Sequence, residues 1–333
     1  MKKFPQAFTL EDNQRVIIEF EKLLRNRGLK IPVNSPLEEA SLAILEMLEI
    51  RKNKAVHNKK VDCRERWRQA LFLADMARKI VRAQRHPDFD TLFPHLKLLL
   101  EPGNFSQFSA CKISASPKEK EINNKIFELY VAAILFQICS NLKLDNPNSS
   151  KGDNPDVIGE YNSKKWAFAC KVSHSKNPLA FLQRVREGVS QIENKKTKAD
   201  RGLVVINFKN LIPHDGIWRA ARDKQNNEWI YESYMNRDEP VLKMRDLFRK
   251  FEQKVYDKAG GCRAFVDEFV GKKTVPMVLI FNCTVAGYSP NIGVVMPIIS
   301  KQMSGLGLPQ EYLDPEAAKI IDLFNDYLHD RIE

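Results

Sequence analysis

The chain has 333 residues, of which 43% are hydrophobic and 29% charged, and its formal net charge is +11. This length allows one large domain or two ordinary ones, each with a buried core. No apolar run is long enough to span a bilayer, and the first residues lack the apolar region of a signal peptide, so we expect a cytoplasmic protein with no membrane partner. The positive charge suits a nucleic-acid partner, although many basic proteins bind none.

The six cysteines are scattered singly and lack the spacing of a zinc site, so we expect reduced, mostly buried thiols. Positive charge is concentrated between Arg51 and Arg68, where eight basic residues accompany two acidic ones. This segment is either a solvated loop and helix face or a surface that contacts phosphates.

Residues 1–105 predict an all-helical N-terminal domain. Thr9, Ser35 and Asp62 each stand three residues before a carboxylate, which is the spacing of a capping box at the start of a helix. The helix expected after Asp62 carries apolar residues at helical spacing, so one of its faces should be buried.

A stretch rich in Ser, Pro and Gly follows at 101–117, and Ser116 then begins a capping box for a further helix. This helix is expected to run to about residue 142, and its apolar part continues all round the helix, so it should be buried on most sides. Glu128 and Gln137 alone interrupt that apolar part.

The rest of the chain, 106–333, predicts an α/β domain with a C-terminal extension of helices and a strand. The expected elements are two strands around a polar turn within 154–173, helices beginning at Asn177, Glu239 and Asp314, and core strands at 202–208 and 274–285.

Side chains alternate along the second of the two strands within 154–173. One face carries Trp166, Phe168, Cys170 and Val172, and the other carries Ala167, Ala169, Lys171 and Ser173. Position 169 lies about 6.5 Å from Lys171 along the strand. A carboxylate there would adjoin the ammonium group and could share a metal ion with Asp156 on the neighbouring strand.

Acids grouped with a lysine suit the metal-dependent hydrolysis of a phosphodiester. Magnesium takes carboxylate, water and phosphate oxygens as ligands, supplies hydroxide near neutral pH and offsets transition-state charge, while a lysine orients the water. Glu128 is a candidate third acid, because an unpaired charge in an apolar helix is costly. Taken singly, each residue has a plainer role: Asp156 in a turn, Lys171 reaching solvent at a strand end, and Glu128 facing solvent near a helix N-terminus.

The order of these elements resembles the core of the PD-(D/E)xK nuclease superfamily. Glu128 lies in a leading helix, Pro155 and Asp156 open one strand, Lys171 closes the next, and a helix and an apolar strand follow. The resemblance covers about residues 116–211. It implies a restriction-endonuclease-like core, a mixed central sheet flanked by helices, which follows the helical N-terminal domain.

Carried over residue by residue, the resemblance implies that Asp156 and Glu128 bind magnesium or manganese and that Lys171 positions the attacking water. The (D/E)xK triplet falls on Ala169, Cys170 and Lys171, so the acid that would bind the metal at position 169 is missing. Because a methyl group cannot bind a cation, the chain as written should hold metal poorly and cleave slowly or not at all.

Three interpretations of Ala169 are open. The favoured one is an engineered replacement of a native Asp or Glu, because Glu128, Asp156 and Lys171 are all retained. The second is a natural pseudonuclease that still binds nucleic acid. The third places the acid at Glu160, which lies about 13 Å beyond Asp156 along the strand and is therefore the weakest choice.

Basic and polar residues around this site are candidate nucleic-acid contacts. They are Lys165, His174, Lys176, Arg184 and Gln191. In some branches of the superfamily a glutamine of the following helix contributes to the site, and the resemblance assigns this role to Gln191. A surface position is the plainer interpretation both for Gln191 and for His174.

We therefore expect a metal-dependent nuclease that acts on nucleic acid, with DNA as the favoured substrate. By association with the family, it would be a bacterial phage-defence effector that works as a homo-oligomer or with an ATPase or another defence-system protein. The alternative is a catalytically inactive nucleic-acid-binding or scaffold subunit.

Overall fold

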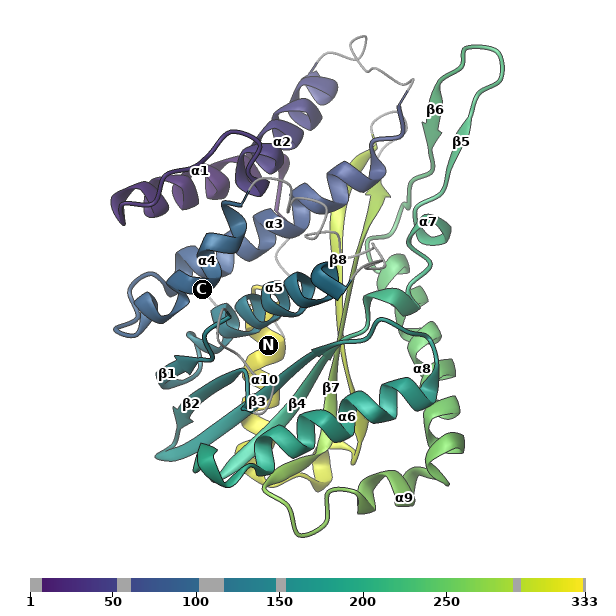
Figure 1. The fold of residues 1–333 in the computed structure, drawn as a ribbon. Helices are drawn as coiled ribbons and strands as arrows, with labels where there is room; N and C mark the ends of the chain where they lie inside the picture. Colours follow the sequence, from purple (N-terminus) through teal and green to yellow (C-terminus); the bar gives the residue numbers. More distant parts are fainter. Residues whose placement is uncertain (1–7, 53–60, 102–116, 148–153, 290–294, 332–333) are drawn as a thin grey trace.

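A computed structural model of the chain describes all residues except 1–7, 53–60, 102–116, 148–153, 290–294 and 332–333. Its centre is a six-stranded sheet in the order β1-β2-β3-β4-β7-β8, with helices on both faces (Figure 1). The strands are β1 (Ser140–Leu144), β2 (Val157–Tyr161), β3 (Lys164–Val172), β4 (Arg201–Asn207), β7 (Thr274–Tyr288) and β8 (Met296–Gly307). The pairs β3–β4 and β4–β7 are parallel and the others antiparallel, so the predicted α/β class with a mixed central sheet is confirmed.

Helices cover the sheet in layers. They are α1 (Leu10–Asn26), α2 (Pro36–Lys52), α3 (Arg64–Ala83), α4 (Phe93–Leu96), α5 (Pro117–Leu135), α6 (Pro178–Glu193), α7 (His214–Ile217), α8 (Glu239–Ala259), α9 (Cys262–Asp267) and α10 (Pro315–Leu328). One face of β3, with Trp166, packs on the α3, α5 and α10 side, and the other, with Ala167, packs against α6, α8 and α9. Figure 1 shows α1 and α2 stacked outside α3, away from the sheet.

The predicted capping signals at two helix starts are confirmed. The Thr9 hydroxyl accepts the Asp12 N–H at 3.1 Å, and Ser35 Oγ accepts the Glu38 N–H at 3.3 Å. The third signal is displaced, because α3 begins at Arg64 after Cys63, and the Asp62 carboxylate instead accepts the Arg64 N–H at 3.1 Å and binds the Arg64 guanidinium. The capping box expected at Ser116 lies outside the described residues.

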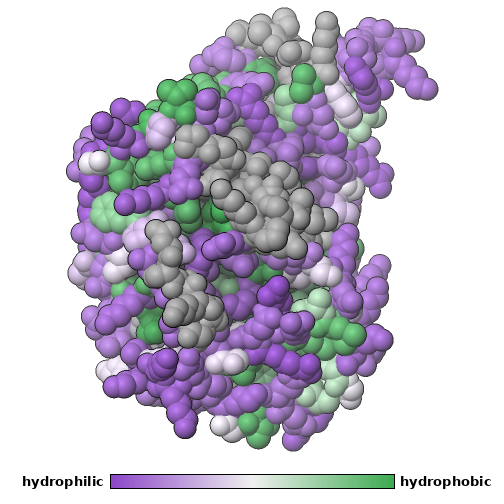
Figure 2. All heavy atoms as spheres, viewed as in Figure 1, coloured by the Kyte–Doolittle hydropathy of each residue, from purple (hydrophilic) through white to green (hydrophobic). Residues whose placement is uncertain are grey.

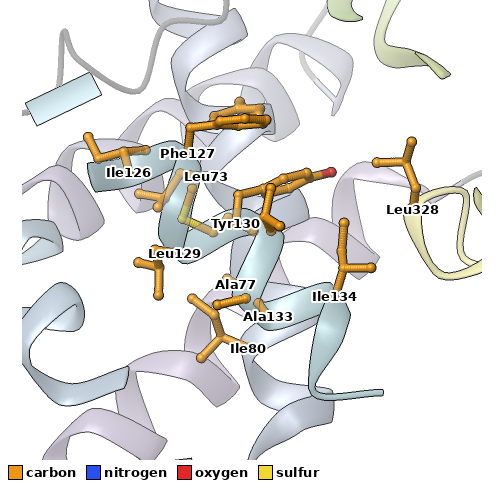
Figure 3. Packing of buried hydrophobic residues seen from close by; sticks show 14 of the residues in the cluster. Leu73, Ala77, Ile80, Ile126, Phe127, Leu129, Tyr130, Ala133, Ile134 and Leu328 are labelled. Carbon is orange, nitrogen blue, oxygen red and sulfur yellow. The ribbon is translucent and has the colours of Figure 1, made fainter. Parts of the chain in front are cut away.

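The N-terminal helices share their buried interior with the sheet. Figure 3 shows side chains of α3 and α5 packed together, with Leu328 of α10 beside them. One cluster of buried residues runs from Leu10 in α1 through α3 and α5 to the Trp166 face of β3. The division into domains at residue 105 stays a prediction. The two parts on either side of residue 105 meet in a broad apolar contact.

A network of buried charges also joins these layers. Lys301 of β8 places its ammonium 2.8 Å from Asp75 of α3 and 3.0 Å from Asp330, which follows α10. Lys79 lies 3.5 Å and 3.3 Å from the same two carboxylates, and the Tyr130 hydroxyl of α5 donates to Asp75 at 2.6 Å. Removing one partner from such a set leaves an uncompensated buried charge.

Strands β1 and β8 are not predicted by the local sequence. The helix predicted to run to about residue 142 is too long, because α5 ends at Leu135 and Ser140 begins β1. Asn141 in β1 takes a left-handed φ of 51°, and the Asp88 carboxylate accepts the Leu142 N–H at 2.8 Å, so contacts from a distant segment hold this short edge strand. The ladder with β7 holds β8 from Met296 to Gly307.

A second, two-stranded sheet also lay outside the expectations. Strands β5 (Ala220–Arg222) and β6 (Trp229–Tyr231) form a hairpin that projects at the upper right of Figure 1. Aromatic contacts anchor its base to α3, since the Trp218 ring lies 5.9 Å from Trp67 and 5.8 Å from Tyr231.

The arginines of the basic segment are engaged within the fold. Arg51 binds Glu11, Arg66 lies 2.9 Å from Glu46, and Arg68 lies 2.8 Å from Asp215 next to the hairpin. Arg64 and Arg68 are buried, so they form neither a solvated face nor a phosphate-contacting surface. Lys54, Lys59 and Lys60 of this segment lie outside the described residues.

The face of the molecule seen in Figure 1 is largely polar. Figure 2 shows hydrophilic residues over most of the face seen in Figure 1, with hydrophobic residues scattered among them. Within the described part of the chain, no helix combines the length and the apolar character that crossing a membrane requires.

Candidate active site

The strand register places Asp156 beside the segment of β3 that contains Ala169. Val157 at the start of β2 pairs with Phe168 of β3, and the Asp156 N–H donates to the Phe168 carbonyl at 3.1 Å. Asp156 directly precedes β2 and therefore lies next to the Phe168–Cys170 part of β3. Glu160 pairs with Lys165 near the other end of β2, and its carboxylate binds Asn141 there, so it does not join Asp156.

The Asp156 carboxylate lies beside the backbone of β3, just before β2 begins. Its Oδ2 accepts the backbone N–H of Cys170 at 2.7 Å. Backbone N–H groups lie close to the plane of the sheet, so a carboxylate bound to one can be approached from both sides. Asp156 is 4% exposed and almost all of its surface contacts protein.

Charged groups approach Asp156 from both faces. Lys171, on the α6 side, places Nζ 3.7 Å from Asp156 Oδ2, with its side chain 13% exposed. Glu128, on the α5 side, is buried, and its Oε2 lies 3.0 Å from Lys125 Nζ and 3.3 Å from His95 Nε2. The alternative that Glu128 faces solvent is therefore wrong, and Lys171 turns toward an acid.

The two carboxylates have opposite pKa shifts. Burial raises the pKa of Asp156 to about 7, and the Glu128 charge adds to this, while Lys171 and the Cys170 N–H oppose it. Burial also favours the neutral form of Glu128, but the hydrogen bond from His95 and the Lys125 charge hold its pKa below the usual range. Asp156 is thus the carboxyl that gains most from an added cation.

The raised pKa of Asp156 predicts a pH-dependent effect of Asp156→Asn. The folded chain holds the Asp156 proton up to about pH 7, whereas the unfolded chain releases it near pH 4, so raising the pH from 4 to 7 destabilises the fold. The Asn variant has no titrating group at this position. Its free energy of unfolding should therefore rise relative to that of the parent chain by up to about 1.4 kcal/mol per pH unit over this range. Urea denaturation at pH 5, 6, 7 and 8 measures this, and a constant difference would contradict it.

Position 169 faces an apolar helix surface. The Ala169 side chain is fully buried in a cluster with Val185 and Val189 of α6. A Cβ placed on Gly188 would lie 3.4 Å from Ala169 Cβ and 2.9 Å from a Val204 methyl, so the helix backbone approaches the sheet closely here. A carboxylate at 169 would need a cation or a polar neighbour at the sheet edge to be stable.

The residues present do not form a complete metal site. No group of three or more His, Cys, Asp or Glu side chains able to hold a metal ion occurs among the described residues. Asp156 and Glu128 are the oxygen donors that a hard divalent cation would use, and Lys171 and Lys125 are the ammonium groups beside them. In the arrangement that the nuclease resemblance implies, a third carboxylate would stand at position 169, beside Asp156 and Glu128.

The predicted nucleic-acid contacts are spread over the domain. Lys165 is the second residue of β3, about 20 Å along the strand from Lys171, and so lies away from Asp156. His174 is half-buried, and Lys176 is exposed in the loop that leads into α6. Arg184 on α6 is half-buried and lies 2.6 Å from Glu187.

Gln191 is buried, so the interpretation of it as a surface glutamine is wrong. It lies on α6 one turn beyond Gly188, which faces Ala169, and next to Ile192, which contacts Gly202. Gly202 pairs with Ala167, so the end of α6 lies over the first half of β3. The backbone of Gln191 therefore lies nearer to Ala167 than to Lys171.

Sequence reasoning missed Lys125 and His95. Lys125 stands three residues before Glu128, a spacing that places both on one helix face and could have indicated the pair. His95 comes from α4, and nothing in its local sequence indicates that it meets α5.

A further lysine also lies near this end of the sheet. Lys209 follows β4, is buried, and donates to Asn123 of α5 at 2.8 Å.

Comparison with known proteins assigns no family. No protein-family model matches the chain, and no match was found among curated proteins or among solved structures.

Proposed function

We propose that this protein is a metal-dependent nuclease with a restriction-endonuclease-like core, whose site lacks one ligand at position 169. Its substrate is nucleic acid, with DNA favoured, and it acts in the cytoplasm. The observation that carries the proposal is the position of Asp156, whose carboxylate accepts the Cys170 N–H and lies 3.7 Å from the Lys171 ammonium. Its role as a phage-defence effector, as a homo-oligomer or with an ATPase, rests on the family resemblance alone.

The charges of the site support this proposal. Asp156 and Glu128 are buried close enough for the Glu128 charge to raise the pKa of Asp156. A divalent cation would remove that repulsion, and when bound it supplies hydroxide and offsets charge at the phosphate. Lys171 lies at the C-terminal end of β3, where its ammonium group can orient a water molecule beside Asp156.

A second candidate is a nucleic-acid-binding or scaffold subunit without catalysis. It is favoured by the contacts of Glu128, whose carboxylate already has Lys125 and His95 as partners. It is also favoured by the close approach of Gly188 to Ala169, which leaves position 169 packed as part of an apolar contact. In that case the chain as written is the functional form.

The two candidates differ in what Ala169→Glu does. For a nuclease, this variant should cut supercoiled plasmid, linear DNA or RNA in the presence of Mg²⁺ or Mn²⁺, at least about 100-fold faster than the parent chain. Gel assays with each substrate measure this, and chelation with EDTA should abolish it.

Matched variants decide whether such cutting belongs to this site. Ala169→Gln has nearly the same shape without the charge and should stay inactive, as should Ala169→Glu combined with Lys171→Met. If a folded Ala169→Glu chain cuts none of these substrates while the parent chain binds DNA with a strong inverse salt dependence, the second candidate is the better one.

A further inference from the structure

A cavity of about 480 Å³ lies beside α3 and β8, next to the buried charged residues of these two elements. It is bordered by α1, by α3, by the start of α8 and by β8, and none of its lining residues belongs to the candidate active site. Its volume is in the range of pockets that bind small molecules.

Apolar and aromatic side chains form much of the cavity wall. They include Phe8, Leu71, Val241, Tyr288 and Ile299. Together they can enclose a flat or branched apolar body about the size of one or two rings, because such pockets bury most of their ligand against apolar groups.

Positive charge lies at two places in this wall. Lys301 lines it from the buried network, and Arg237 lines it from the start of α8, with its guanidinium over the Tyr288 ring at 4.5 Å from the centroid. Asp238 is the carboxylate among the lining residues. Arg237 is exposed, so it is available to a ligand entering the cavity.

The network below the cavity adds to the positive charge. In its ion pairs, Asp75 and Asp330 are shared by four cations, Arg78, Lys79, Arg82 and Lys301. Burial lowers the pKa of Lys79 to about 8, with Asp75 opposing this and Lys301 adding to it. Asp12 also interacts with Arg78, so four cations meet three carboxylates in and beside this network, and the remaining positive charge lies next to the cavity.

Arg78 connects this network to the cavity wall. Its guanidinium lies 3.4 Å from the centroid of the Phe8 ring and donates to Asn13 at 2.8 Å, and both Phe8 and Asn13 line the cavity. Arg78 therefore holds Phe8 and Asn13, two residues of the cavity wall, and is also one of the cations of the buried network.

From this geometry we infer that the cavity binds a small organic anion, a ring-sized apolar body that carries one negatively charged group. The apolar wall takes the body and the exposed Arg237 takes the charge, while the Lys301 ammonium, paired with Asp75 and Asp330, stands behind the wall. Because the ligand would contact α1, α3, α8 and β8 together, it would hold the N-terminal helices on the sheet. This inference is independent of the nuclease proposal.

Two fluorescent probes test both halves of the inference. The first, 1-anilinonaphthalene-8-sulfonate, has a ring body and one sulfonate, and the second, N-phenyl-1-naphthylamine, has the same rings without the charge. The parent chain should bind one sulfonate probe per chain, at least about tenfold more tightly than the uncharged amine, as expected for one charge-assisted contact. No saturable binding, or equal affinity for both probes, would overturn the inference.

Variants place the binding in the cavity. Arg237→Gln should reduce the preference for the sulfonate probe at least about fivefold while keeping affinity for the amine, because it removes a charge and little wall. Ile299→Trp should fill the space and weaken both probes. Arg249→Gln, another exposed arginine of α8 outside the cavity lining, is the control and should change neither. Unchanged affinities in the first two variants would show that the probes bind elsewhere and would contradict the inference.

Discussion

Asp75→Ala is expected to destabilise the protein by about 3–5 kcal/mol, because it leaves buried cations without their carboxylate. Asp75 lies 2.8 Å from Lys301 and 3.5 Å from Lys79, and it accepts the Tyr130 hydroxyl at 2.6 Å. Folded proteins are stable by only about 5–15 kcal/mol, so the loss is a large part of the total. Urea denaturation followed by circular dichroism measures it.

Two comparisons make this expectation specific to the charge. Asp246→Ala removes an exposed acid of α8 and should change stability by less than about 0.5 kcal/mol. Asp75→Ala combined with Lys301→Met removes both partners of one pair and should cost less than the sum of the single changes. An additive double variant would mean that Asp75 and Lys301 do not interact as the distances indicate.

The same carboxylate predicts sensitivity to acid. Burial would raise the pKa of Asp75, but Lys301, Lys79 and Arg78 hold it below its usual range. A depressed pKa gives stability that is present above about pH 4 and is lost as the pH falls toward the folded-state value. The difference between the parent chain and Asp75→Ala should therefore shrink below pH 4.

Ala169→Glu is expected to make the stability of the protein depend on divalent cations. Without metal, the new carboxylate lies between Asp156 and the apolar face of α6, and the variant should unfold more easily than the parent chain. A cation that binds only the folded state restores about 2.7 kcal/mol at a concentration 100 times its dissociation constant. Melting curves in MgCl₂ or MnCl₂, against NaCl of equal ionic strength, measure this without any assay of cleavage.

The parent chain and Ala169→Gln are the matched controls. Neither has a third carboxylate at the sheet edge, so their melting temperatures should respond to MgCl₂ no more than to NaCl. An Ala169→Glu chain that is equally indifferent would contradict a cation site at Asp156, whatever its activity.

Much of the sheet could be predicted from local sequence. The apolar run of β4 predicts a strand buried on both faces, and β4 lies between β3 and β7. Strand β1 gives no such signal, because it is short, lies at an edge and depends on the Asp88 carboxylate for one of its hydrogen bonds. In β8, Lys301 stands inside the strand because Asp75 and Asp330 pair with it, and both acids lie far away in the sequence.

The candidate site divides in the same way. The polar turn between the two strands predicts that Asp156 lies on the strand next to Lys171, and β2 and β3 are indeed antiparallel neighbours. The burial of Glu128 was expected from its apolar helix, but its partner His95 reaches it across 33 residues of sequence. The contact between Gly188 and Ala169 depends on how closely α6 lies on the sheet. The periodicity of apolar residues shows which face of a helix is buried, but it does not show this distance.

The tryptophans report on separate parts of the chain. Trp67 and Trp218 stack where α3 meets the base of the hairpin, whereas Trp166 is enclosed in the central sheet. Stacked indoles couple their electronic transitions, so we expect the first pair to contribute a near-ultraviolet circular dichroism signal that is lost when the contact breaks. In a chain with Trp67→Phe, Trp218→Phe and Trp229→Phe, the remaining tryptophan fluorescence comes from Trp166. If residues 1–105 melt separately from the sheet, the circular dichroism signal of the parent chain and the Trp166 fluorescence will change in different transitions, and coincident transitions will identify one cooperative unit.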